Sequence, residues 1–219
     1  MMKIEQVLWD WNGTLLDDLE YSIQVRNNIF PAFHLPTLSG VEEYHRQFTF
    51  PVRLYYQRAG VTDEIFDDVA HAWMAEYERR MDTIPLHGDA VETVERFRRA
   101  GLRQTVLSAS EQTLLRRQLA LYGLEGRFDA ILGRGDIYAG SKEAIGREYL
   151  QGSGVPAEAT VMIGDSLHDA EVARALGTRC ILVARGHQSR ETLLEAGVPV
   201  VDSLRKAADW VLEQKEMDG

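Results

Sequence analysis

Short apolar runs alternate with amphipathic stretches along most of the chain. The runs are too short for helices and are bounded by glycine or polar residues, which is typical of buried strands in a parallel sheet. The stretches between them carry apolar residues at helical spacing. This alternation predicts an α/β fold with a doubly wound parallel sheet covered by helices on both faces. The expected strands are residues 4–9, 102–107, 130–132, 160–163, 180–183 and 198–201, and the expected helices between them are residues 90–100, 111–121, 142–150, 167–176 and 204–213.

One interval interrupts the alternation. Residues 17–83 contain no strand-like run, and helical spacing continues through residues 19–33, 41–48, 52–59 and 64–81. We therefore expect an all-helical insertion over the carboxyl ends of the strands, where doubly wound sheets bind ligands. Pro85 and Gly88 mark the return to the sheet. The expected division is a core domain, residues 1–16 and 84–219, and a helical cap domain, residues 17–83.

Composition narrows the class of protein. The 219 residues are 45% hydrophobic and 26% charged, which is the balance of a globular enzyme. A net charge of -10 disfavours nucleic acids and anionic membranes as partners, but not a small phosphorylated metabolite, which responds to the local field of its pocket. No apolar run approaches the ~18 residues of a membrane span, so we expect a cytoplasmic protein. The sequence is compatible with a monomer and with a homodimer.

Acidic side chains appear where two of the expected strands end. Asp10 follows the apolar run of the first strand and precedes a glycine turn, and Asp165 follows the fourth strand. Asp169 comes four residues later, near Asp165 at the start of a helix. Neighbouring acids repel one another unless a cation separates them, and carboxylate oxygens are the ligands that Mg²⁺ prefers. A capping role for the acids is the alternative interpretation.

Two further features lie at strand ends or helix starts. Residues Ser108, Ala109 and Ser110 follow the second strand and offer hydroxyls and backbone N–H groups to an anion, although serine also caps helices. Lys142 is one of only four lysines and opens a helix, where a cation is electrostatically unfavourable unless it faces a negative partner.

Together these residues resemble the motifs of the haloacid dehalogenase superfamily, in the right order along the whole chain. The superfamily's Asp-x-Asp-Gly-Thr block is present as Asp10-Trp11-Asn12-Gly13-Thr14, its strand-terminal serine as Ser108, its lysine as Lys142 and its acidic block as Gly164 to Asp169. The helical insertion and the acidic pair look most like the phosphoglycolate phosphatase and β-phosphoglucomutase branch. The resemblance implies a Rossmann-like core, a cap domain and an Mg²⁺-dependent phosphatase acting on a small phosphate monoester.

The resemblance also implies a role for each motif residue. Asp10 is expected to attack phosphorus and carry the phosphoryl group as an aspartyl-phosphate. Mg²⁺ is expected on Asp10, Asp165 and the backbone carbonyl of Asn12. Asp169 is expected to orient Lys142 or metal-bound water. The other phosphoryl oxygens are expected to be held by Lys142, Ser108 and Ser110, by Thr14, and by backbone N–H groups near Gly13 and Ala109.

Asn12 departs from the superfamily pattern. The phosphatases carry an acid there, which protonates the leaving oxygen and then deprotonates the attacking water; an amide exchanges no proton at neutral pH. Three interpretations follow: a slow phosphatase with another proton carrier, for which Asp17, Asp18 and His87 are available; a phosphate-binding or regulatory protein with little turnover; or a phosphatase altered deliberately to trap a complex.

Substrate recognition is expected in the cap. Its available cations are Arg26, Arg46, Arg53 and Arg58, and Arg53 is the expected pocket residue because it opens a helix after a proline. The aromatic residues of the cap are expected mainly in its own core. No lysine lies between Asp17 and Pro85, which argues against the phosphonoacetaldehyde hydrolase branch, because that branch needs a cap lysine.

Overall fold

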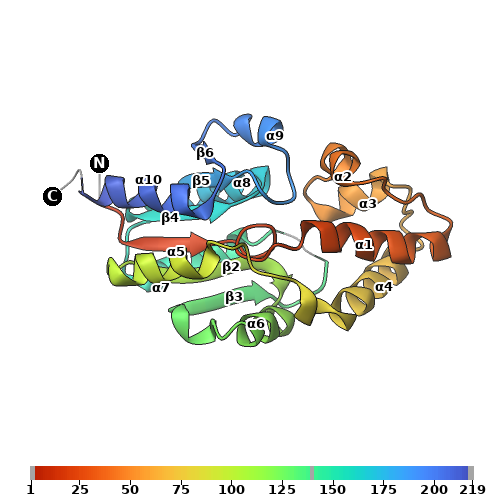
Figure 1. Ribbon diagram of the computed structural model, residues 1–219, viewed down its shortest axis with the longest axis horizontal. Coiled ribbons are helices and arrows are strands. Elements are labelled where there is room, and N and C mark those ends of the chain that lie inside the picture. Colours follow the sequence, from red (N-terminus) through yellow and green to blue (C-terminus); the bar gives the residue numbers. More distant parts are fainter. Residues whose placement is uncertain (1–2, 139–140, 217–219) are drawn as a thin grey trace.

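The protein is built around one six-stranded parallel sheet, as the computed structural model describes it for residues 3–138 and 141–216 (Figure 1). The strand order is β3-β2-β1-β4-β5-β6, which reverses direction at β1 and confirms the expected doubly wound, Rossmann-like architecture. The strands are β1 (Gln6–Trp9), β2 (Arg103–Glu111), β3 (Ala130–Arg134), β4 (Thr160–Gly164), β5 (Arg179–Val183) and β6 (Val200–Val201).

Alternate residues of each strand face opposite layers of helices, because successive side chains of a strand point to opposite faces of the sheet. Val7 and Trp9 pack in the cluster formed with α5 (Ala90–Arg99), α6 (Gln112–Leu121) and α10 (Leu204–Glu216). Leu8 packs in the opposite cluster with α7 (Glu143–Ser153) and α8 (Leu167–Leu176). Burial on both faces explains why the strands read as continuous apolar runs.

Between β1 and α5 every described element is a helix. These are α1 (Leu19–Ile29), η1 (Phe30–Phe33), α2 (Val41–Gln47), α3 (Val52–Arg58), α4 (Phe66–Arg79) and η2 (Met81–Thr83), which we call the helical cap. The cap has its own buried cluster, in which Phe30, Tyr56 and Val69 take part. The strands point toward the cap, and the start of β1 and the end of α10 lie at the opposite end of the molecule (Figure 1). The exact domain division stays a prediction.

The two chain segments that join the cap to the sheet lie side by side. Leu16 and Leu86 form an isolated antiparallel bridge. On either side of it, the backbone N–H of Asp17 donates to Pro85 (2.9 Å) and that of His87 donates to Leu15 (3.0 Å). Two short paired segments, residues 15–17 and 85–87, therefore connect the cap to the sheet domain.

Several details differ from the pattern-based expectation. The short α9 (Arg190–Leu194) and the 3-10 turns η3 (Glu125–Arg127) and η4 (Ala157–Ala159) were not expected, because one or two turns carry too little periodicity to detect. β2 does not end at Leu107; it continues to Glu111 through an irregularity in its pairing with β3. Helix α6 accordingly begins after Glu111, whose carboxylate caps its first turn.

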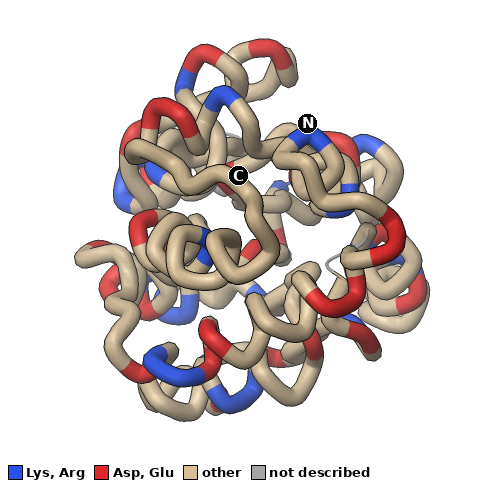
Figure 2. The backbone as a smooth tube through the Cα atoms, turned by 90° about the vertical axis from the view of Figure 1, so that its right-hand side faces the viewer, with Lys and Arg blue, Asp and Glu red and all other residues tan. Residues whose placement is uncertain are grey.

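Charged residues of both signs lie around the cap end of the molecule. Acidic and basic segments are interspersed around the cap end of the molecule rather than sorted into a basic stripe (Figure 2). Across the part of the chain that the structure describes, no helix combines the length and the apolar character needed to cross a bilayer.

Candidate active site

Two acidic residues meet at the carboxyl edge of the sheet. β1 and β4 are neighbours in register, with Trp9 opposite Ile163, so the residues that follow each strand lie together. Asp10 donates its backbone N–H to Ile163 (2.9 Å), and Asp165 lies just beyond Gly164 at the end of β4. The central position of these strands buries both carboxylates beneath the cap.

Lys142 is the cation of this cluster. It is the residue that precedes α7, and it is 1% exposed. Its ammonium forms a hydrogen-bonded ion pair with Asp10 and a second ion pair with Asp169 (2.7 Å). Although burial alone would lower it, the charges of the two carboxylates hold the pKa of Lys142 above its ordinary value. Lys142 is therefore charged and aimed at Asp10, as expected for a group that meets phosphoryl oxygens.

Both carboxylate oxygens of Asp169 have partners within the protein. One carboxylate oxygen accepts from the backbone N–H groups of Asp165 (3.1 Å) and Ser166 (3.0 Å) and from the Ser166 hydroxyl (2.6 Å), which forms a capping box at the start of α8. Its other oxygen faces Lys142. The carboxylate thus ties the lysine to a helix terminus.

Three carboxylates crowd this site. One oxygen each of Asp10, Asp165 and Asp169 lies within 4.8 Å of the others. Burial raises the pKa of Asp10 to about 6 and that of Asp165 to about 8, with the neighbouring negative charges adding to the effect. Asp10 and Asp169 pair with Lys142, while the protonated His187 faces both Asp18 and Asp165. Four carboxylates thus share two cations, which leaves two negative charges without a compensating cation when all are ionised. A divalent ion that binds oxygen ligands fits this deficit.

The loops around Asp165 pass unusually close to its carboxylate. A Cβ on Gly13 would lie 2.2 Å from Asp165 Oδ2, and one on Gly186 would lie 2.0 Å from it. Gly13 also has φ +71°, which favours glycine. The backbone N–H of His187 donates to the same oxygen at 2.5 Å. Thr14 donates weakly to Asp10 or Asp165, at 3.4 Å from each.

Asn12 is fixed by both of its polar atoms. Its amide nitrogen donates to Asp18 (2.7 Å) and to the Tyr77 hydroxyl (3.1 Å), and its carbonyl oxygen accepts from the Ser110 hydroxyl (2.6 Å). Tyr77 comes from α4 of the cap and also donates to Asp18 (2.9 Å). The amide is therefore complementary to its surroundings as a donor, where a carboxylate would face the Asp18 carboxylate.

His187 is a site residue that the sequence analysis missed. Its Nε2 lies 3.2 Å from Asp18 and its Nδ1 lies 2.8 Å from the Tyr44 hydroxyl of the cap. Although burial would lower it, the charge of Asp18 raises the pKa of His187 to about 9. Its position after the apolar run of β5 was the available signal, because polar residues at the carboxyl ends of parallel strands gather at one edge.

The three proton carriers considered for the Asn12 position lie in different settings. Asp18 is buried and accepts from Asn12, Tyr77 and the backbone N–H of Gly13 (2.8 Å), and His187 pairs with it. Asp17 is exposed and lies 3.5 Å from His87, whose other ring nitrogen contacts the Gly13 carbonyl at 3.1 Å. Burial lowers the pKa of His87.

A cavity of about 160 Å³ connects this cluster with the interior of the cap. Asp10, Asn12, Lys142, Asp165 and Asp169 line it, as do Ser108, Ala109 and Ser110. The predicted substrate-binding residues Gly13, Thr14 and Arg53 are not among its lining residues. Gly13 and Thr14 instead support carboxylates, as described above.

Arg53 lies half-exposed on α3. It forms an ion pair with Asp63 (2.7 Å) and lies over the ring of Phe66. The rings expected in the cap core do pack there, with Tyr55 and Tyr56 buried, but Phe48, Phe50 and Trp73 line the cavity along with them.

Comparison with known proteins gives a consistent picture. The family model described as "Haloacid dehalogenase-like hydrolase" matches residues 7–183. The chain is 28% identical over 188 residues to a putative pyrophosphatase, PpaX, of Caldanaerobacter subterraneus, covering 83% of this chain and 82% of that protein. It is 22% identical to a phosphoglycolate phosphatase of Pseudomonas savastanoi, covering 94% and 79%. A predicted phosphatase from Clostridium acetobutylicum has the same fold, with a TM-score of 0.85 at 19% identity, covering 97% and 100%.

Proposed function

We propose that this chain, which belongs to the haloacid dehalogenase-like hydrolase family, is an Mg²⁺-dependent phosphatase that hydrolyses a small phosphate monoester through an aspartyl-phosphate on Asp10. The observation that carries the proposal is the buried pairing of Asp10 with Lys142 on the wall of the cavity beneath the cap. A carboxylate held beside a fixed ammonium can approach an anionic phosphoryl group, whereas an isolated one would be repelled.

The protein's own residues account for the first displacement apart from protonation of the leaving oxygen, for which Asn12 offers no acid and which then falls to another carrier or to solvent. A carboxylate oxygen of Asp10 forms a bond to phosphorus while the bond to the leaving oxygen breaks, and the phosphoryl group stays on Asp10. Lys142 offsets the charge of the equatorial oxygens, and Asp169 keeps Lys142 in place. Ser108, which lines the cavity, supplies a hydroxyl toward the same oxygens. A water molecule then attacks phosphorus as the bond to the Asp10 oxygen breaks, which releases phosphate and restores the Asp10 carboxylate; the proton that the water loses passes to the phosphate or to solvent.

The residues present fit a resident Mg²⁺ ion. Its ligands would be the carboxylates of Asp10 and Asp165 and the backbone carbonyl of Asn12. All of these offer oxygen atoms, and the carboxylates carry negative charge that the protein does not compensate. When bound, the ion supplies a positive charge that lets two anions approach one another and stabilises the transferring phosphoryl group. Asp169 is already engaged with Lys142 and the start of α8, so we assign it no direct ligation.

The size of the cavity favours a small ester. About 160 Å³ holds roughly ten to fifteen water-sized groups, which suits a metabolite rather than a polymer. A phosphoglycolate-like ester or a sugar phosphate fits this limit, and several relatives are named phosphoglycolate phosphatases.

Asn12 favours a second candidate function. Without an acid there, the chain could capture a phosphoryl group and release it slowly, as a phosphate-binding or regulatory protein would. Intact Asp10, Lys142 and Asp165 favour catalysis, because burying like charges together brings no structural gain.

A screen of alkyl and aryl phosphate monoesters, each with Mg²⁺ or with a chelator, separates the two functions. We expect phosphate release from at least one ester with Mg²⁺ and none with the chelator. Continuous release, measured over many turnovers, identifies a phosphatase. Release of one equivalent of the alcohol or phenol without phosphate, or no reaction with any ester, would leave the binding function.

The matched variants Asp165→Asn and Asp169→Asn should affect different kinetic quantities. Loss of the Asp165 charge should raise the Mg²⁺ concentration at half-maximal activity or abolish activity, because a proposed ligand is gone. Asp169→Asn should act more mildly and lower kcat at nearly unchanged Mg²⁺ dependence, because an amide still accepts the α8 hydrogen bonds but no longer pairs with Lys142. Mg²⁺ titrations of both variants test this division, which is wrong if Asp169→Asn shifts the midpoint more.

A further inference from the structure

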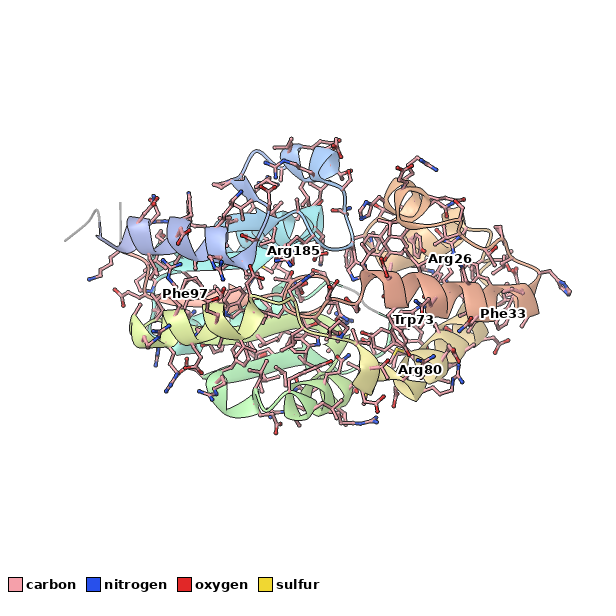
Figure 3. All side chains as sticks on the ribbon, in the orientation of Figure 1. Arg26, Phe33, Trp73, Arg80, Phe97 and Arg185 are labelled. Carbon is pink, nitrogen blue, oxygen red and sulfur yellow. The ribbon has the colours of Figure 1, made fainter. Side chains whose placement is uncertain are left out.

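A buried arginine of the cap has unused hydrogen-bond donors. Arg26, on α1, is 1% exposed and lines the cavity that also holds Asp10. One of its terminal nitrogens donates to the Tyr55 hydroxyl at 2.6 Å. Its Nε and its other terminal nitrogen are buried and have no hydrogen-bond partner among the described residues. Figure 3 marks Arg26 on α1 and Trp73 on α4, both within the cap.

The side chains that pack on the Arg26 guanidinium are aromatic, and Glu43 acts on its charge from a distance without forming an ion pair. Its guanidinium lies over the rings of Phe30 (4.6 Å to the centroid) and Tyr55 (5.1 Å). No carboxylate forms an ion pair with it within residues 3–138 and 141–216. A buried guanidinium with unpaired N–H groups is costly unless a ligand completes it, and a planar pair of donors matches a carboxylate or phosphate.

Arg26 lies on the face of α1 that begins near the Asp10 cluster. Asp18, Ser22 and Arg26 are spaced four residues apart, and all three line the cavity. Arg26 is therefore about 12 Å along α1 from Asp18, which contacts Asn12. A long arginine side chain shortens that span, so one small molecule could reach both Asp10 and Arg26.

We infer that Arg26 binds a second anionic group on the leaving part of the substrate, with the Tyr55 hydroxyl as an additional donor. The substrate class is thus a phosphate monoester whose alcohol carries a distal carboxylate or phosphate. Aromatic side chains such as Phe48, Phe50 and Trp73 cover the apolar stretch between the two anions. The inference rests on the proposed function, because the ester phosphate must occupy the Asp10 end.

Binding of non-hydrolysable probes tests the inference without turnover. Phosphonoacetate and its longer homologues, each paired with the neutral carboxamide of the same length, are titrated calorimetrically into the parent protein with Mg²⁺. At one chain length at least, the carboxylate should bind about 10- to 100-fold more tightly than its amide, the usual effect of a charged hydrogen bond. A parallel series that ends in a second phosphonate distinguishes a carboxylate substrate from a bisphosphate.

Variants of three cap arginines assign the preference. Arg26→Gln should reduce the ratio of carboxylate affinity to carboxamide affinity to near one. Arg58→Gln, on the exposed end of α3, should leave this ratio unchanged. Arg26→Lys retains a charge and supplies a second test if the glutamine variant does not fold. Equal binding of acid and amide in the parent at every length overturns the inference, as does a preference that survives both Arg26 changes or disappears in Arg53→Gln instead.

Failure of the proposed function gives a different result. In that case the probes bind with the preference for a distal anion, but no ester is hydrolysed. Hydrolysis of esters without any such preference would leave the phosphatase standing and remove the Arg26 assignment.

Discussion

Replacing Asp10 by asparagine is expected to abolish phosphate release while leaving the protein folded. Loss of a catalytic nucleophile lowers turnover by factors on the order of 10⁴ to 10⁶. The fold should tolerate the amide, because burial already raises the pKa of Asp10 and disfavours its charged form. Lys142 keeps Asp169 as a partner in the variant. Phosphate release and circular dichroism of the same sample measure the two effects.

Beryllium fluoride provides the control for this variant. It mimics a phosphoryl group on a carboxylate, so it should bind the parent protein and not Asp10→Asn. Turnover at the parent's rate would falsify the proposed nucleophile, provided that mass spectrometry shows no Asp10 regenerated by deamidation of the variant's asparagine.

The second large effect is expected at Asn12. An alkyl leaving group must be protonated as it departs, whereas an aryl group leaves as a stable phenolate and needs little help. Asn12→Asp should therefore speed hydrolysis of alkyl phosphates by up to ~10² to 10⁴, with a smaller gain for aryl esters unless dephosphorylation limits both. Rapid-quench measurements separate the steps, because the aspartyl-phosphate should accumulate in the parent protein, where no base activates water.

The contacts of Asn12 call for a companion variant. A carboxylate at this position would face Asp18, which now accepts a hydrogen bond from the amide at 2.7 Å. The double change Asn12→Asp with Asp18→Asn reverses donor and acceptor and avoids two adjacent carboxylates. If neither variant speeds alkyl esters while both stay folded, another group already moves the proton, and the interpretation of Asn12 as a catalytic deficit must be abandoned.

The fold followed largely from the alternation of apolar runs and helical spacing. Each expected strand is present, and α8 begins and ends where the pattern places it, because burial on both faces of a parallel sheet leaves a strong apolar signal. Short elements such as α9 escaped detection. The end of β2 was also misplaced, since a pairing irregularity after Leu107 depends on β3 and not on local sequence.

The chemistry of the site was less evenly predictable. The sequence signals three of the site residues clearly. A carboxylate directly follows an apolar strand or its terminal glycine at Asp10 and Asp165, and a lysine stands at the positive end of a helix dipole at Lys142. His187 and Tyr77 reach the site from a loop and from the cap, so only tertiary structure brings them to Asp18. For the same reason the sequence could not show that Arg53 pairs with Asp63 at the surface or that Arg26 is buried in the cavity.

The glycines at positions 13 and 186 restrict how this sequence can change over time. They come from segments more than 170 positions apart, yet each lies against one oxygen of Asp165, where even a methyl group would occupy the carboxylate's space. Any substitution at either glycine must displace the Asp165 side chain. A descendant sequence that keeps Asp165 in this place therefore needs glycine at both positions, and a side chain at either one would signal that the carboxylate has moved.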